Sequence, residues 1–301
     1  MKTVTVNNLS KSYGKVKAIE NISFEVNEAE IFGLIGPDGA GKTTIFRILT
    51  TLLLADEGTA SVLNYDVIKD YKKIRQIIGY MPGRFSLYQD LTVEENLNFF
   101  ASVFGTTVNE NYELIKDIYH QIEPFKKRRA GALSGGMKQK LALSCALIHK
   151  PEILILDEPT TGVDAVSRKE FWEMLRHLKE KGITILVSTP YMDEASLCDR
   201  VALIQKGKIM QIDKPSEIVN HFDRTLYAIR AGNIYQLLQS LREFELTNSA
   251  YPFGQYVHYT AKEQINDVAN LQAHLTGKGF QHIEIQEIKP NIEDCFMALM
   301  G

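Results

Sequence analysis

The chain has 301 residues, of which 45% are hydrophobic and 24% are charged, enough to bury one large core, or a large core and a small one. Its 34 basic and 37 acidic residues give a net charge of −3, so we expect no nucleic-acid partner. The three cysteines, Cys145, Cys198 and Cys295, form no C-x-x-C pair, which predicts free thiols in a reducing compartment such as the cytoplasm.

The first part of the chain predicts antiparallel strands followed by an α/β core. Residues 1–30 alternate between apolar and polar, with VTVNNL and ISFEV separated by the turn-prone stretch Ser12–Lys15. Three short apolar runs follow at 31–36, 153–156 and 183–189, with helical patterns between them. Because fully apolar strands that alternate with helices are typical of sheets covered on both faces, we expect a parallel sheet in an α/β fold.

Two further regions have a different character. Residues from about 85 to 150 are rich in helical periodicity and poor in strands, which predicts a helical insertion. Residues 223–301 carry six basic and nine acidic residues, whereas residues 1–222 are neutral overall, so we place a domain boundary near residue 222. The tail is expected to be a small α+β appendage with the order strand, helix, strand, strand, helix, strand and a final helix.

A phosphate-binding loop is predicted where the first apolar run ends. The sequence GPDGAGKTT fits the pattern G-x-x-x-x-G-K-[ST] between a predicted strand and a predicted helix. Its backbone N–H groups and the helix N-terminus are expected to bind the phosphates of a nucleoside triphosphate. Lys42, a candidate catalytic residue, is expected to bind the β- and γ-phosphate oxygens, and the Thr43 hydroxyl to bind Mg²⁺. The predicted nucleotide-binding residues of the loop are Gly36, Asp38, Gly39, Ala40, Gly41, Lys42, Thr43 and Thr44.

Two more motifs carry polar groups at the ends of predicted elements. The strand ILIL is followed by Asp157, a candidate Mg²⁺ ligand, and by Glu158, a candidate catalytic residue that polarises the attacking water. The alternative is that these acids cap a following helix. Ser134, Gly135 and Gly136 open a helical run, where free N–H groups and a hydroxyl suit a phosphate. Taken alone, this motif also fits an ordinary helix N-cap.

Together, the strings GPDGAGKTT, LSGGMKQKL and ILILDEPTTGVD resemble the ATP-binding cassette (ABC) family over about residues 3–220. The resemblance implies a P-loop ATPase that holds two ATP molecules, with Mg²⁺, between two chains in a head-to-tail dimer. It implies that the Ser134–Gly136 segment closes over the γ-phosphate bound by a partner chain, and that the loop Gly162–Asp164 couples the two sites. It further implies that Tyr13 stacks on adenine, the alternative being an exposed tyrosine in a turn.

Within this family, the elements TVEENLNFF, MDEA, CDRV and EDCFMALM look most like exporter ATPases of the drug-resistance type, whose membrane spans are on separate chains. No apolar run here reaches the roughly 18 residues that a membrane span needs. The resemblance implies a cytoplasmic chain on the inner face of the cell membrane, which contacts integral membrane subunits through residues 83–105. The tail is then a regulatory or dimer-stabilising addition. Two alternatives stay open: a regulatory module that binds ATP with little hydrolysis, and a soluble ABC ATPase without a transport role.

Two positions depart from the family pattern. After the strand IIGYM the family has proline and then glutamine, whereas this chain has Gly83 at the glutamine position. The family has histidine where this chain has Pro190, which offers neither a side-chain donor nor a backbone N–H. Arg84 and Tyr191 are candidate substitutes; an exposed loop arginine is the alternative for Arg84.

Both altered positions serve the chemistry at the γ-phosphate in the family. We therefore expect ATP binding to persist and hydrolysis at this chain's own site to be weak. An intact Ser134–Gly136 segment beside altered sensor positions favours a heterodimer with a second ABC ATPase chain over a homodimer.

Overall fold

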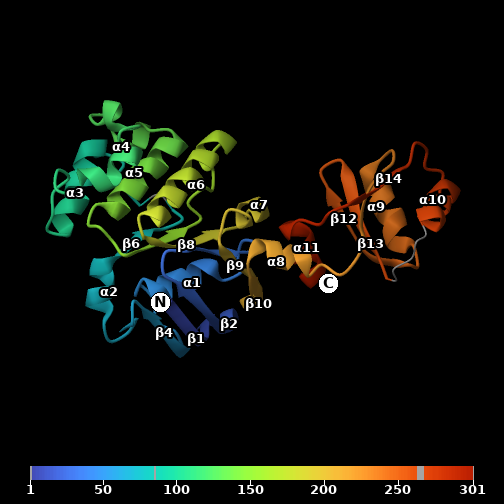
Figure 1. Ribbon diagram of the computed structural model, residues 1–301, viewed down its shortest axis with the longest axis horizontal. Helices are drawn as coiled ribbons and strands as arrows, with labels where there is room; N and C mark the ends of the chain where they lie inside the picture. The colour runs from blue at the N-terminus through green and yellow to red at the C-terminus, as the bar shows by residue number, and fades with distance from the viewer. Residues whose placement is uncertain (1, 85, 263–267, 301) are drawn as a thin grey trace. The chain divides into compact units, whose positions relative to one another are not determined.

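The computed structural model describes residues 2–84, 86–262 and 268–300; Phe85 of the expected membrane-facing segment and residues 263–267 of the tail lie outside the described residues. The chain forms two compact units, residues 1–215 and 216–301 (Figure 1). The division falls a few residues before the boundary expected near residue 222, because most of helix α8 (Pro215–Asn220) belongs to the second unit. Within the described ranges, no helix combines the length and the apolar character that crossing a bilayer requires.

The first unit is built on a six-stranded sheet in the order β10-β9-β3-β8-β7-β6, in which only the pair β10 and β9 is antiparallel. Its strands are β3 (Ile31–Ile35), β6 (Ile78–Met81), β7 (Ile153–Asp157), β8 (Thr184–Thr189), β9 (Arg200–Gln205) and β10 (Lys208–Asp213). Strands β3, β7 and β8 are buried along their whole length, as their largely apolar runs predict. The expected parallel core is confirmed.

A second, antiparallel sheet confirms the predicted N-terminal strands. It has the order β2-β1-β4-β5 and consists of β1 (Lys2–Tyr13), β2 (Val16–Asn27), β4 (Glu57–Val62) and β5 (Tyr65–Asp66). Helix α1 (Lys42–Leu49) contacts both β4 and β7, and its Phe46 shares one core with Val6 of β1 and Leu34 of β3. Helix α6 (Ala165–Glu180) contacts β3 and β8, and Figure 1 shows it on the side of the main sheet opposite α1.

The helical insertion expected at about 85–150 is present as a group of helices at one end of the first unit (Figure 1). Its members are α3 (Val93–Val103), α4 (Tyr112–Tyr119) and α5 (Gly135–Leu147), with short 3₁₀ turns at Glu123–Phe125 and Ala130–Ala132. Local signals fix the helix starts: Thr92 and Glu95 form a capping box at α3, and Ser134 caps α5. Two shorter helices, α2 (Tyr71–Ile77) and α7 (Met192–Ala195), precede β6 and follow β8.

The second unit is a four-stranded antiparallel sheet in the order β12-β13-β11-β14. Its elements are β11 (Leu226–Arg230), α9 (Ile234–Glu243), β12 (Thr247–Phe253), β13 (Tyr256–Ala261), α10 (Val268–Gly277), β14 (Glu284–Ile288) and α11 (Ile292–Met300). The order β-α-β-β-α-β followed by a helix is the order expected for the tail. Helices α9 and α10 bury their apolar faces on one core with Ile229 and Val257 of the sheet.

A buried polar cluster fixes α11 to this sheet. Asp294, whose side chain is fully buried, accepts hydrogen bonds from Tyr251 Oη at 2.7 Å and from the backbone N–H of Asn291 at 2.8 Å. The same carboxylate lies 2.6 Å from Nδ1 of His258, which is also buried. Burial alone raises the pKa of Asp294, but the hydrogen bonds from His258, Tyr251 and Asn291 outweigh it and lower the pKa below its usual value.

We expect the Asp294→Asn substitution to lower the free energy of unfolding of the second unit by about 1–3 kcal/mol, because it leaves buried donors without a charged acceptor. Since the folded pKa lies below the unfolded one, the stabilisation is present above the unfolded value near pH 4 and is lost as the pH falls through the folded value. Thermal unfolding followed by circular dichroism measures the loss. The fluorescence of the single tryptophan, Trp172, follows unfolding of the first unit, and the midpoint of that thermal transition is expected to stay the same. Glu287→Gln, which changes an exposed side chain of the second unit, is the control.

Candidate functional site

The phosphate loop lies between β3 and α1, where the sequence predicts it. A Cβ atom at Gly36 would approach the Ile204 carbonyl oxygen to 2.1 Å, so only glycine fits there. Gly41, just before α1, has φ +108°, a conformation that glycine adopts without strain. Among the other predicted loop residues, Asp38 and Gly39 are exposed, Thr43 is partly exposed, and Ala40 and Thr44 are buried.

Lys42 connects this loop to the second predicted motif. Its side chain is buried, and its ammonium group donates hydrogen bonds to the carbonyls of Gly36 at 2.7 Å and Pro37 at 3.0 Å. The same group lies 3.1 Å from Oε1 of Glu158, at the end of β7. The structure therefore brings the lysine of the loop and the candidate catalytic carboxylate into direct contact.

Asp157 and Glu158 differ in environment although they are neighbours. Asp157 is buried and accepts a hydrogen bond from the Ser188 hydroxyl at 2.7 Å. Glu158 has φ +50°, which turns its partly exposed side chain away from the strand direction, and its N–H donates to the Ser188 carbonyl at 3.1 Å. The alternative of a helix cap finds no support, because the next helix, α6, is capped by Asp164.

The two departing positions lie next to these groups. A Cβ atom at Gly83 would lie 3.1 Å from the Asp157 carbonyl oxygen, so position 83 borders the β7 end. Thr189, just before Pro190, accepts a hydrogen bond from the Gly36 N–H at 3.3 Å, so position 190 borders the phosphate loop. Arg84 is exposed, as expected of a loop arginine, and the Tyr191 ring is covered by the Arg168 guanidinium at 4.9 Å.

The remaining predicted residues lie on other parts of the first unit. Tyr13 ends β1 at the β1–β2 turn and is 46% exposed. Ser134 caps α5 by accepting a hydrogen bond from the Met137 N–H at 3.4 Å, and Gly135 beside it is exposed. A Cβ atom at Gly136 would lie 2.7 Å from the Ser167 hydroxyl oxygen, so glycine is needed where α5 meets α6. Both the N-cap reading and an exposed phosphate receptor are compatible with this geometry.

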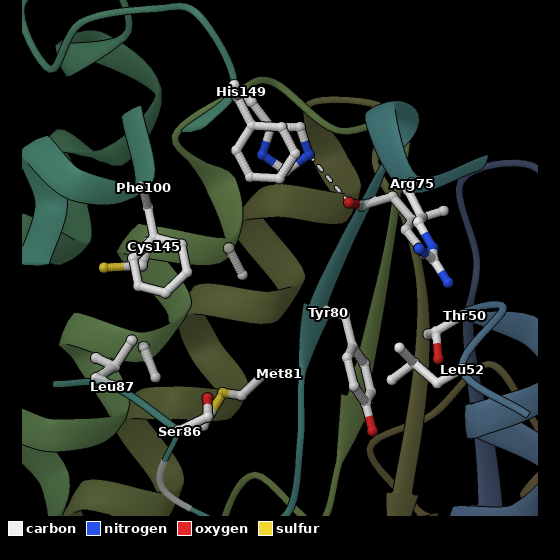
Figure 2. A pocket seen from close by; sticks show the side chains of 14 residues that line it. Thr50, Leu52, Arg75, Tyr80, Met81, Ser86, Leu87, Phe100, Cys145 and His149 are labelled. Carbon is white, nitrogen blue, oxygen red and sulfur yellow. Dashed lines mark hydrogen bonds between the residues drawn. The ribbon is translucent and has the colours of Figure 1, made fainter. Parts of the chain in front are cut away.

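A groove that the sequence did not reveal lies between the helical insertion and the main sheet. It is a cavity of about 310 Å³. Figure 2 shows Phe100, Cys145 and Leu87 along one side and Tyr80, Leu52 and Thr50 along the other. Burial and the nearby Asp157 carboxylate raise the pKa of Tyr80 to about 12, so its hydroxyl keeps its proton. Among the described lining residues, four belong to the segment 83–105 that is expected to contact membrane subunits: Ser86, Leu87, Phe100 and Phe104.

His149 forms one end of this groove. Its Nε2 donates to the Ile78 carbonyl at 3.0 Å, the hydrogen bond drawn as a dashed line in Figure 2. Its ring stacks on the Phe104 ring with 3.7 Å between the ring centroids. Because burial lowers the pKa of His149, the ring is neutral at pH 7. Its buried Nδ1 atom has no hydrogen-bond partner within the part of the chain that the structure describes. Among the described residues, the groove thus has a largely apolar lining that includes an unpartnered acceptor, Nδ1 of His149.

Comparison with known proteins agrees with the geometry. Residues 19–161 match the family model described as ABC transporter. The chain is 32% identical to the linearmycin resistance ATP-binding protein LnrL of Bacillus subtilis, over 98% of this chain and 97% of that protein. It is 38% identical to the Nod factor export ATP-binding protein I of Burkholderia lata, over 98% and 95% of the two chains.

Other alignments cover only part of one of the two compared chains. The probable multidrug ABC transporter ATP-binding protein YbhF of Escherichia coli is 37% identical over 99% of this chain, which spans 52% of YbhF. A solved ATP-binding subunit of an ABC transporter gives a TM-score of 0.66 at 28% identity, covering 73% of this chain and 93% of that one. A dimeric ATP-binding cassette in a post-hydrolysis state, bound to ADP and Pi, gives a TM-score of 0.64 at 26% identity, covering 70% and 98%.

Proposed function

Because this chain belongs to the family of ABC transporter ATP-binding proteins, we propose that it is the ATPase subunit of an exporter whose membrane spans are on other chains. The names of LnrL, Nod factor export protein I and YbhF all describe resistance or export, which supports this direction of transport. The observation that carries the ATPase assignment is the contact of 3.1 Å between Lys42 of the phosphate loop and Glu158 at the end of β7. In this proposal the chain acts from the cytoplasmic face of the membrane.

The residues of the site fit Mg²⁺ and ATP in distinct roles. Bound Mg²⁺ neutralises phosphate charge, and Thr43 and Asp157 are its proposed protein ligands. The Lys42 ammonium exchanges the Gly36 and Pro37 carbonyls for phosphate oxygens when the nucleotide enters, because both are acceptors and the phosphates carry full charge. The same move of the Lys42 ammonium breaks its ion pair with Glu158, which leaves this carboxylate free to polarise the attacking water.

The Ser134–Gly136 segment is proposed to bind the γ-phosphate of a partner chain. Ser134 and Gly135 are exposed at the N-terminus of α5, where the Ser134 hydroxyl accepts a hydrogen bond from the Met137 N–H, and a helix N-terminus attracts anions. The solved relative that is described as a dimer with ADP and Pi supports assembly in pairs. We further propose that Tyr13 stacks on adenine, that Gly162–Asp164 couples the two sites, and that the second unit stabilises or regulates the dimer.

We propose that hydrolysis at this chain's own phosphate loop is weak and that its partner is a different ABC ATPase. Gly83 borders Asp157 and Pro190 follows the strand that hydrogen-bonds to Gly36, so both lie at the site and neither supplies a side-chain donor. The same two residues favour the second candidate function, a regulatory subunit that binds ATP with little turnover.

The groove of Figure 2 is proposed to receive a cytoplasmic segment of a membrane subunit. ABC cassettes pair with membrane subunits, and Leu52, which lines the groove, is 59% exposed. Tyr88 and Val103, which are next in sequence to the lining residues Leu87 and Phe104, are 50% and 61% exposed. The occupant is expected to present apolar side chains to Tyr80 and Phe100, and a hydrogen-bond donor to Nδ1 of His149.

The Leu52→Glu substitution is expected to reduce recovery of the membrane subunit at least about tenfold, because it places a charge in an apolar contact. The measurement is affinity purification of the tagged chain from detergent-solubilised membranes with ATP and Mg²⁺. The control is Tyr235→Glu, which changes a side chain of similar exposure, 65%, on the second unit. Equal recovery with both variants would show that the groove is not the docking site.

The same purification tests the proposed function. We expect the native chain to recover a protein with several membrane spans and a second cassette chain. Recovery of ribosomes or of no membrane protein would contradict the exporter assignment, and recovery of this chain alone as its own partner would contradict the heterodimer.

A further inference from the structure

The catalytic candidate Glu158 needs support from its surroundings. Its φ of +50° lies in the left-handed region, which costs a residue other than glycine about 1–3 kcal/mol and persists only where neighbouring contacts offset this cost. On the strand side, the Glu158 N–H donates to the carbonyl and the hydroxyl oxygen of Ser188, at 3.1 and 3.0 Å. On the other side, the Glu158 carbonyl accepts from the Thr161 N–H at 3.2 Å, which folds the chain back into a turn.

Thr160 anchors this turn to a separate helix. Its side chain is completely buried, and its hydroxyl donates to Oε2 of Glu194 on α7 at 3.0 Å. Its carbonyl accepts from the Val163 N–H at 3.3 Å, so the same residue also shapes the loop that leads to α6. The turn that aims Glu158 is therefore fixed at its centre by one side-chain hydrogen bond.

Glu194 is an unusual anchor because it is a carboxylate with only 3% of its surface exposed. Its second oxygen, Oε1, has no hydrogen-bond partner among the described residues, and the nearest cation is the Arg168 guanidinium at 3.9 Å. Burying a carboxylate costs several kcal/mol unless a charge offsets it, and 3.9 Å is too long for a hydrogen bond but short enough for attraction.

Arg168 connects this carboxylate to two further segments. It lies on α6, which begins directly after the Gly162–Asp164 loop, and its guanidinium stacks on the Tyr191 ring at 4.9 Å. It also lies 3.8 Å from Asp193. The turn after β7, the start of α6 and the segment after β8 thus meet at Glu194.

From this arrangement we infer that Glu194 is a positioning residue for ATP hydrolysis, which holds the Glu158 carboxylate in place through the Thr160 hydroxyl. The inference rests on the proposed role of Glu158. It gives the segment after β8 a part in catalysis although Pro190 has no donor of its own. In this inference, the segment after β8 does not contact the phosphate. It acts on the Glu158 carboxylate through the turn that contains Thr160.

The test compares Thr160→Val with Thr160→Ser in the full chain. Valine keeps the shape and removes the hydroxyl, whereas serine keeps the hydroxyl. Single-turnover hydrolysis is measured with protein in excess over ATP, and nucleotide affinity with a fluorescent non-hydrolysable ATP analogue. We expect Thr160→Val to slow hydrolysis about tenfold, with affinity unchanged within about twofold, and Thr160→Ser to restore most of the rate.

A double-mutant cycle adds a readout that a general loss of stability does not move. Glu194→Met, which removes the acceptor and keeps a side chain of similar length, is expected by itself to slow hydrolysis about as much as Thr160→Val does. Once Thr160→Val has removed the donor, adding Glu194→Met is expected to slow hydrolysis little further, because the two residues act through one bond. Native rates in Thr160→Val, or a loss that Thr160→Ser does not rescue, would overturn the inference. Glu158→Gln separates the two hypotheses: if it leaves hydrolysis unchanged, the proposed role of Glu158 fails, and if it abolishes hydrolysis while Thr160→Val does not slow it, only the positioning role fails.

Discussion

Replacing Glu158 with glutamine is expected to slow single-turnover ATP hydrolysis by this chain about 10²–10³-fold while ATP still binds. The amide occupies the same space and still accepts a hydrogen bond from Lys42, but it no longer takes a proton from the attacking water. Hydrolysis is measured with excess protein over labelled ATP, and binding with a fluorescent ATP analogue. We expect the analogue to bind the native chain and the variant with affinities within about twofold.

Lys42→Ala is the control for loss of binding. The lysine contacts the loop carbonyls of Gly36 and Pro37 as well as Glu158, so its removal is expected to weaken both the loop and its attraction for phosphates. This variant should therefore lose affinity for ATP at least about tenfold, unlike Glu158→Gln. A homodimer with ordinary turnover that Glu158→Gln leaves unchanged would refute the assigned role of Glu158 and the heterodimer together.

The sequence could predict that Lys42 and Glu158 belong to one site, because both residues follow buried parallel strands. The carboxyl ends of such strands lie at one edge of a sheet, so the loop after β3 and the acids at the end of β7, with only β8 between the two strands, are placed at the same edge. The helix starts were equally local: Ser134 and Asp164 each cap a helix through their own side chains.

The groove and the hydrogen bond between Thr160 and Glu194 could not be predicted from the sequence, because both depend on side-chain packing between distant segments. The groove combines the end of α1 with β6, α3 and α5, and its apolar residues have the same helical spacing as ordinary core positions. Thr160 and Glu194 are 34 residues apart, and neither has a neighbour in sequence that signals the bond. The buried Asp294 was missed for the same reason, because its partners Tyr251 and His258 lie on other elements.

If the two departing positions limit hydrolysis, restoring them should accelerate it. We expect the double substitution Gly83→Gln with Pro190→His to raise the single-turnover rate by about tenfold to a hundredfold, because each side chain returns a hydrogen-bonding group to the γ-phosphate region. The two gains need not multiply, since both groups act on one transition state. The same excess-protein assay measures the change, with Glu158→Gln added to show that the gain depends on the same carboxylate.

The structure sets the matched control for this experiment. A Cβ atom at position 83 lies 3.1 Å from the Asp157 carbonyl oxygen, so any side chain there makes the loop shift by a few tenths of an ångström, whatever its chemistry. Replacing Pro190 likewise returns a backbone N–H next to Thr189. The double substitution Gly83→Ala with Pro190→Ala reproduces both of these backbone effects without the amide or the imidazole, and we expect it to leave the rate near the native value. A gain of equal size in the alanine pair would assign any weakness of native hydrolysis to backbone geometry. A native rate that already equals the rate of the restored variant would show that this site does not need the two missing side chains.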